Sequence, residues 1–182
     1  MDVEPGAFAP PAERAESPPA AGELREKSAL LVRENRLDEA VEILGNLHTQ
    51  FPDDQQVLFD YVTALAWAGR YKRAADLSGG FAGLEVPEYA LAAAAQSQRH
   101  SGRLAQAEIL YRQGAAQYAR SPDFLAGLAL TLAEAGRFDE ARSVLENADT
   151  AAVLEARTRE EVAGYINNRE AESAAKSDQI SV

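Results

Sequence analysis

The side chains that could carry out chemistry are few in this sequence, and their spacing does not favour catalysis. The chain has no cysteine, and neither His48 nor His100 has a second ligand at the short helical spacing of a zinc site. Gly79-Gly80 lacks the Gly-x-x-x-x-Gly-Lys spacing of a phosphate-binding loop, and Ser78-Gly79 is not a nucleophile elbow. The sequence therefore predicts a protein that is not an enzyme and that holds neither a metal nor a cofactor.

Aromatic and arginine side chains offer a different chemistry, which is recognition. The single tryptophan, Trp67, has Phe59 and Tyr89 on either side of it in the sequence, and arginines flank this region at Arg33 and Arg99. Aromatic residues and arginine are enriched among the residues that carry most of the binding energy of an interface. Phe59 and Trp67 could equally pack between neighbouring helices, so the residue types alone leave both interpretations open.

A recurring string of residues shows which elements must position these side chains. The strings NRLDEA, GRYKRA, GRLAQA and GRFDEA end at Ala40, Ala74, Ala107 and Ala141, which are 34, 33 and 34 residues apart. A period of about 34 residues is typical of helix pairs that stack into a solenoid, because one pair cannot bury its apolar face alone. The sequence thus predicts an all-α fold of about four helix-turn-helix repeats.

Helix-start and helix-end signals divide the chain into these repeats. The predicted repeats are residues 21–54, 55–87, 88–121 and 122–155. Asn35, Gly69, Gly102 or Gly136 ends the first helix of each repeat, where a left-handed residue is favoured. In the second repeat, the two glycines at 79–80 predict that the second helix is short or bent.

The two ends of the chain have a different character from the repeats. Residues 1–20 contain five of the eight prolines, which predicts a disordered Pro-rich tail. Residues 156–174 begin with a capping box at 158–161 and carry an apolar stripe of Val162, Tyr165 and Ile166. This pattern predicts a capping helix over the last repeat, followed by a frayed tail at 175–182.

The charge distribution narrows the class of partner. The net charge is −11, composed of −8 for residues 1–69, +3 for residues 70–120 and −6 for residues 121–182. A nucleic-acid-binding protein would carry a broader basic surface, so we expect no nucleic-acid partner. No segment approaches the roughly 20 apolar residues of a membrane span, and the first 20 residues do not have the pattern of a secretory signal. A cytoplasmic location is the default expectation.

The repeats resemble the tetratricopeptide repeat over residues 21–155, although Lys27 and Ser28 stand where its first helix has Leu-Gly. The resemblance implies a right-handed solenoid whose first helices line a concave groove, and a non-catalytic scaffold that binds a partner segment there. The residues at the groove positions are Arg25, Arg33, Phe59, Thr63, Trp67, Tyr89, Gln96, Arg99, His100 and Glu134. Family members that clamp a C-terminal carboxylate have, in order, Lys, Asn, Asn, Lys and Arg at the positions where this chain has Arg25, Ala29, Asp60, Tyr89 and Ala93. We therefore expect no carboxylate clamp.

A second resemblance suggests an alternative function. Ala64–Gly69, Val86-Pro87 and Leu130–Gly136 resemble the N-terminal periplasmic repeats of bacterial porins that export poly-N-acetylglucosamine. This resemblance implies a periplasmic location and a polysaccharide-binding or exopolysaccharide-export accessory module. Two kinds of partner remain open. Recognition through Arg25, Arg33 and Arg99 would favour an acidic protein or peptide, whereas stacking on Trp67 and Tyr89 would favour a polysaccharide.

Overall fold

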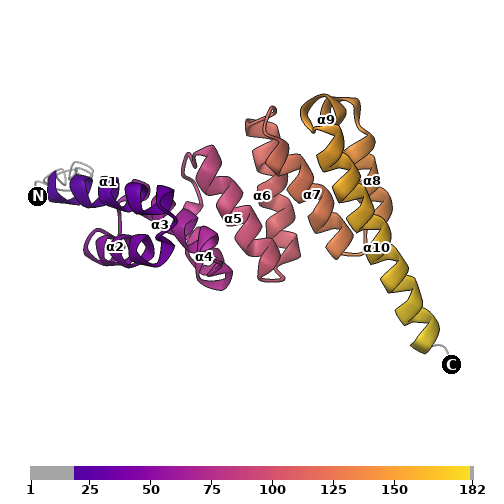
Figure 1. Ribbon diagram of the computed structural model, residues 1–182, viewed down its shortest axis with the longest axis horizontal. Coiled ribbons are helices and arrows are strands. Elements are labelled where there is room, and N and C mark those ends of the chain that lie inside the picture. Colours follow the sequence, from indigo (N-terminus) through magenta and orange to yellow (C-terminus); the bar gives the residue numbers. More distant parts are fainter. Residues whose placement is uncertain (1–18, 181–182) are drawn as a thin grey trace, which may run out of the picture.

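The computed structural model describes residues 19–180, and these residues fold as a row of paired helices (Figure 1). The pairs are α1 (Pro19–Arg33) with α2 (Leu37–Gln50), α3 (Gln55–Trp67) with α4 (Tyr71–Leu77), α5 (Glu88–His100) with α6 (Leu104–Gln117), and α7 (Pro122–Glu134) with α8 (Phe138–Glu146). Helices α3, α5 and α7 begin at the residues where the sequence places the second, third and fourth repeats.

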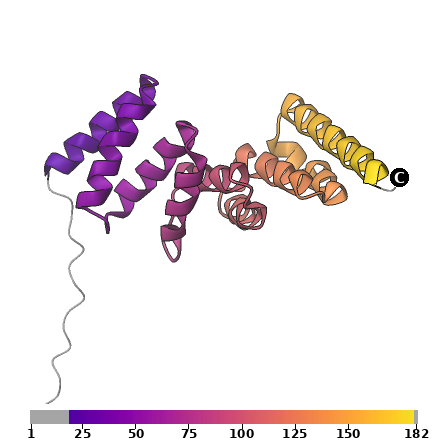
Figure 2. The same cartoon turned by 90° about the horizontal axis from the view of Figure 1, so that it is seen from below.

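Each helix packs mainly on its neighbours along the chain, and this arrangement makes the fold a solenoid. Helices of one pair contact each other, the second helix contacts the next pair, and the first helices also contact one another, α3 with α5 and α5 with α7. Seen from below in Figure 2, the helix pairs follow one another from one end of the molecule to the other. The predicted all-α solenoid is confirmed.

The repeated alanines explain how closely the helices approach. Ala40, Ala74, Ala107 and Ala141 are all completely buried, each near the start of a second helix. A methyl side chain at this position lets the neighbouring helix come close, and the larger apolar residues fill the space beside it. The turn before each second helix has positive φ, 59° at Asn35 and 70° at Gly69, as the sequence predicts.

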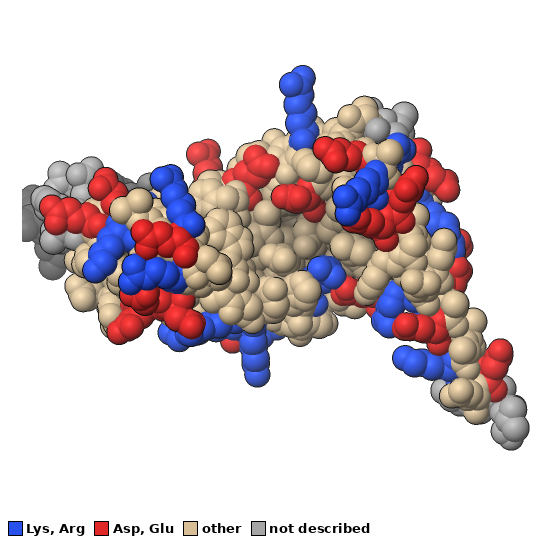
Figure 3. Space-filling model, viewed as in Figure 1, with Lys and Arg blue, Asp and Glu red and all other residues tan. Residues whose placement is uncertain are grey.

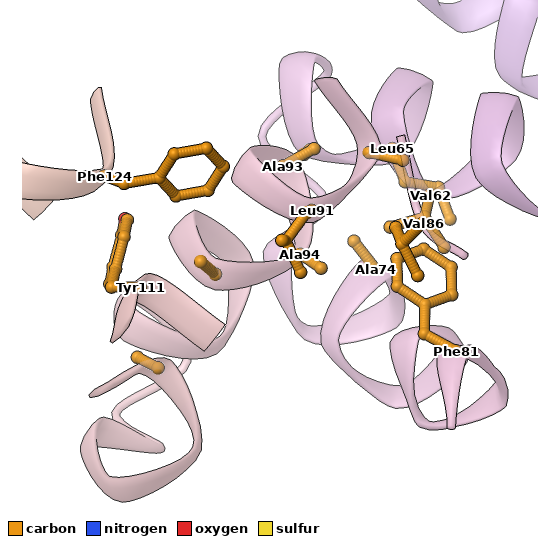
Figure 4. Packing of buried hydrophobic residues seen from close by; sticks show 14 of the residues in the cluster. Val62, Leu65, Ala74, Phe81, Val86, Leu91, Ala93, Ala94, Tyr111 and Phe124 are labelled. Atoms are coloured by element: carbon orange, nitrogen blue, oxygen red, sulfur yellow. The ribbon is translucent and has the colours of Figure 1, made fainter. Parts of the chain in front are cut away.

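The second repeat departs from the others after α4. The helix ends after seven residues, and the chain continues into the short 3₁₀ helix η1 (Ser78–Phe81). The buried Gln98 amide holds this bend, because it donates hydrogen bonds to the Ala75 carbonyl and the Ser78 hydroxyl, both at 2.9 Å. The bend turns Phe81 into the core beside Val62 and Val86 (Figure 4). The predicted short helix is confirmed.

Two glycines allow the closest contact between α6 and α7. A Cβ atom at Gly127 would lie 2.1 Å from Cε1 of Tyr111, and one at Gly114 would lie 2.1 Å from Cδ1 of Phe124. Both rings are buried. The close contact of α6 and α7 fixes the position of Tyr111. Its ring extends from α6, a second helix, to the face of the solenoid that the first helices form.

The C-terminal end is covered as the sequence predicts, but by a longer helix. After the short helix α9 (Ala148–Val153), α10 (Ala156–Ile180) packs on α7 and α8, with Val162 and Ile166 buried. The helix continues past residue 174, so the predicted frayed tail is wrong for residues 175–180. Residues 171–179 are exposed, so they belong to the helix without packing on the rest of the solenoid. Residues 1–18 and 181–182 lie outside the described part, and the Pro-rich tail remains a prediction.

Candidate functional site

A groove runs across the first helices of the second, third and fourth repeats. It has a volume of about 690 Å³, and its lining includes Trp67 from α3, Tyr89 and Arg99 from α5, Tyr111 from α6, and Leu130 from α7. A smaller cleft of about 250 Å³ adjoins it between α1 and α3, and Trp67 and Tyr89 line both spaces. Figure 3 shows a hollowed, largely uncharged face in the middle of the molecule, with charged side chains around it.

Trp67 and Tyr89 are the aromatic surface of this groove. Trp67 is the last residue of α3 and is 53% exposed, and Tyr89, in the first turn of α5, is 40% exposed. Large apolar or aromatic side chains left so exposed at the wall of a concave surface mark an interaction site more often than a lone surface residue does. The structure thus brings together the two aromatic residues that the sequence identified for binding.

A hydrogen-bond network holds Tyr89 in place. Its hydroxyl donates to Asp60 Oδ1 at 2.8 Å and accepts from the Gln56 amide at 2.6 Å. Arg25 donates to the other carboxylate oxygen of Asp60 at 3.0 and 3.1 Å, so the network joins α1, α3 and α5. Burial raises the pKa of the Tyr89 hydroxyl, and the Asp60 carboxylate raises it further. Tyr89 is therefore a fixed, neutral ring at the groove.

Arg99 lies in the groove with its charge already compensated. Its guanidinium donates to Glu134 Oε1 at 2.5 Å, and the side chains are only 14% and 19% exposed. The hydroxyl of Tyr165, on the capping helix, donates to the same oxygen at 3.2 Å. Burial lowers the pKa of Arg99, but Tyr111 and Glu134 outweigh it, so the pKa lies above its ordinary value. This ion pair connects α5 to α7 and occupies both side chains.

His100 is not part of the groove lining that the structure shows. Its ring stacks on Tyr71 at the start of α4, with the ring centroids 4.3 Å apart. Burial lowers the pKa of His100, and the positive charge of Arg99 lowers it further. The predicted groove role of His100 is wrong, because the side chain turns toward the second helix of the preceding repeat.

Phe59 is placed differently from the prediction, and Thr63 lines the smaller cleft rather than the main groove. Phe59 is 4% exposed and packs edge-to-face on Phe81 at 5.2 Å, so it belongs to the core and its predicted groove role is wrong. Thr63 is equally buried and its hydroxyl donates to the Phe59 carbonyl at 2.8 Å, although it lines the floor of the smaller cleft. Gln96 lines the main groove and Arg33 lines the smaller cleft.

Two acidic residues outside the predicted binding set also lie at the groove. Glu88 and Asp123 both line it, each in the first turn of a first helix, and neither side chain forms a hydrogen bond or ion pair within residues 19–180. Their position in the repeat was a usable signal, because Asp123 occupies the same groove position as Tyr89. Tyr111 was overlooked because it comes from a second helix.

The arginine at the start of each second helix has a structural role away from the groove. Arg70 pairs with Asp38 at 2.5 Å, Arg103 pairs with Asp76, and Arg137 pairs with Glu108 at 2.5 Å. Each pair therefore joins one repeat to the one before it.

Residues 19–180 contain neither a candidate metal site nor a candidate membrane span. No group of three or more His, Asp or Glu side chains in this part could hold a metal ion. No helix in it has the length and apolar character needed to cross a bilayer.

Sequence comparisons identify the repeats. Two tetratricopeptide-repeat family models match the chain, one over residues 31–77 and the other over residues 122–147. A comparison with curated protein sequences found no match.

Solved structures support the same class of fold. A thermophilic tetratricopeptide-repeat protein of Thermus thermophilus aligns with a TM-score of 0.60 and 14% identity, covering 80% of each chain. A tetratricopeptide-repeat protein of Parabacteroides merdae aligns with a TM-score of 0.63 and 16% identity, over 83% of this chain and 62% of that one. Yeast Tom70 aligns with a TM-score of 0.57 and 17% identity, and 35% of its chain is covered.

Two stretches of the chain thus match tetratricopeptide-repeat models, and its fold is that of the solenoids of this family. This confirms the first resemblance identified in the sequence. Proteins of this family are typically interaction scaffolds that bind protein partners. The resemblance to the polysaccharide-exporting porins remains a prediction.

Proposed function

We propose that this protein is a non-catalytic scaffold that binds a segment of a partner protein in the groove of α3, α5 and α7. The observation that carries the proposal is the exposure of Trp67 and Tyr89 where the groove and the smaller cleft meet. Burying a large aromatic side chain at the centre of an interface contributes about 2 kcal/mol or more to binding. Trp67 would be the main anchor of such an interface.

The surroundings of the two aromatic rings support recognition rather than catalysis. Two ion pairs close to this surface are already formed, Arg25 with Asp60 and Arg99 with Glu134. A wall of small residues, Ala92 and Ala126 among them, gives a partner close access to the helices. Because the rings and ion pairs are already in place, binding would require little ordering of this surface.

The same ion pairs argue against the acidic partner predicted from the sequence. Two of the three arginines on which that prediction depends, Arg25 and Arg99, are neutralised by Asp60 and Glu134. Asp60 also places a carboxylate where other members of the family hold a partner's C-terminal carboxylate. The groove is therefore poorly suited to a carboxylate clamp.

The proposal can be tested with peptides and two matched variants. Peptides selected from a random library on the full chain should lose at least about 30-fold in affinity for Trp67→Ala, which corresponds to 2 kcal/mol. They should bind Ile109→Ala with unchanged affinity, because Ile109 is an exposed apolar residue on α6 and does not line the groove. Selected peptides that bind both variants equally well would contradict the proposal.

A polysaccharide ligand is the second candidate, and one observation favours it. The exposed rings of Trp67 and Tyr89 line a groove that also carries the neutral polar side chain of Gln96. Trp67 is the only tryptophan, so its fluorescence reports directly on groove occupancy. Titration with oligomers of N-acetylglucosamine should change this fluorescence with saturation if a sugar is the ligand. A flat titration alongside peptides that saturate the signal would reject the sugar.

A further inference from the structure

The charged side chains of the groove leave an uncompensated negative charge. Of the charged groups that line it, Arg99 is paired with Glu134, whereas Glu88 and Asp123 form no hydrogen bond or ion pair in the described part of the chain. The sum is −2, because the Arg99 and Glu134 charges cancel and the other two carboxylates remain. In Figure 3 acidic side chains lie along one side of the hollow.

The two free carboxylates lie on neighbouring helices at the same end of the groove. Glu88 begins α5 and Asp123 is the second residue of α7, and α5 packs against α7. Their stabilising interaction with the helix dipoles explains why acids are tolerated there. Both carboxylates also line the same groove as the exposed aromatic ring of Tyr89.

We propose that the groove selects a partner segment that carries an arginine next to an apolar side chain. This inference rests on the function proposed above and adds the chemical class of the partner. The apolar side chain would pack on Trp67, and the guanidinium would lie over the Tyr89 ring near Glu88 and Asp123. Arginine fits better than lysine because its planar group both stacks on an aromatic face and pairs with carboxylates through several donors.

The polarity of the groove supports this class of partner over an acidic one. An acidic segment would meet two unpaired carboxylates and no free arginine in the main groove, since Arg99 is engaged by Glu134. Like charges brought together at an interface are a strong barrier to binding. A basic segment would instead be attracted by a chain whose net charge is −11.

The experiment compares peptides selected from a phage-displayed library of random peptides of about 12 residues, a length typical of groove-binding segments. The full chain is the bait, and affinities are then measured by titration of Trp67 fluorescence with tryptophan-free peptides. The test variant is Glu88→Gln with Asp123→Asn, which removes both charges and keeps the side-chain shapes. The matched control is Glu42→Gln with Glu146→Gln, which removes the same charge at exposed sites on α2 and α8 outside the groove.

The expected result is enrichment of arginine in the selected peptides and a loss of affinity of roughly 5- to 20-fold for the test variant. The control should change affinity less than about 2-fold, and changing the peptide's arginine to lysine should weaken binding. Peptides that depend on Trp67 but lack arginine, or equal losses in the two double variants, would overturn this inference and leave the proposed function standing. If no selected peptide depends on Trp67, the proposed function itself fails. Thermal unfolding of both double variants establishes that each is folded.

Discussion

Substitution of Gly127 by alanine tests whether the close contact of α6 and α7 builds the groove. The added Cβ would lie 2.1 Å from Cε1, 2.4 Å from Cζ and 2.7 Å from Cδ1 of Tyr111. These atoms belong to a rigid ring that is 4% exposed, so the ring or the helix must move. The ring cannot move freely, because Gly127 and Tyr111 lie where two helices are in direct contact and the hydroxyl interacts with Arg99.

The expected change in the free energy of unfolding caused by Gly127→Ala is the sum of two opposing effects. Overpacking of a buried contact costs about 1–3 kcal/mol, and a clash this short belongs at the upper end of that range. Alanine is favoured over glycine within a helix by up to about 1 kcal/mol, which offsets part of the cost. We therefore expect Gly127→Ala to lower the free energy of unfolding by about 2 kcal/mol in urea denaturation.

The control is Gly164→Ala in α10, where nothing lies within 4 Å of the added Cβ. That variant has the helix-propensity gain without the clash and should be stabilised by up to about 1 kcal/mol. The cost of Gly127→Ala should shrink in a Tyr111→Leu background, since the two residues are in contact. If Gly127→Ala is as stable as Gly164→Ala, the described contact between α6 and α7 is wrong.

Three further predictions address packing, capping and pH. Ala107→Leu should lower the free energy of unfolding by roughly 1–3 kcal/mol in chemical denaturation, because Ala107 is completely buried. The control Gln106→Leu, at the exposed neighbouring position, should change it by no more than about 0.5 kcal/mol. A larger loss for Gln106→Leu than for Ala107→Leu would contradict the assigned buried face of α6. Deletion of residues 156–182 should lower the free energy of unfolding by roughly 3–6 kcal/mol, because it removes the buried side chains Val162 and Ile166. Deletion of residues 171–182 should change the free energy of unfolding little, because residues 171–179 are exposed. Equal losses from the two deletions would refute the capping role of α10. The pKa of His100 in the folded chain is lowered from 6.5, so the stability it contributes is present above about pH 6.5 and is lost as the pH falls through the folded pKa. His100→Asn should therefore flatten the pH dependence of unfolding over that interval, and an unchanged slope would show that His100 does not titrate there as described.

The sequence predicts the backbone of this protein better than its side-chain pairs. The repeated alanines, from Ala40 to Ala141, show which face of each second helix is buried. Each of them is completely buried and follows the positive-φ turn residue of its repeat at the same spacing. Local signals of this kind lie within one repeat and are read directly from spacing. The extension of α10 to Ile180 was not predicted because its last residues are polar and no core contact marks where the helix ends.

The groove was predicted in part, for a physical reason. Trp67 and Tyr89 were identified because groove positions follow from the repeat period, but Phe59 was misplaced because η1 turns Phe81 onto it. The ion pair of Arg99 with Glu134 joins residues 35 apart, and such a pair depends on side-chain conformations that spacing does not specify. Without knowledge of this pair, Arg99 counts as a free positive charge in the groove. For that reason the sequence suggested an acidic partner.

The central claim, that partners bind over Trp67, is tested most directly by acrylamide quenching of its fluorescence with and without a saturating peptide. Trp67 is the only tryptophan and is 53% exposed in the free protein, so acrylamide should quench it efficiently. A bound segment that covers the ring should lower the quenching constant by about half or more, since anchors of this type lie in fully desolvated pockets. An unchanged quenching constant at saturation would show that the partner binds elsewhere on the solenoid.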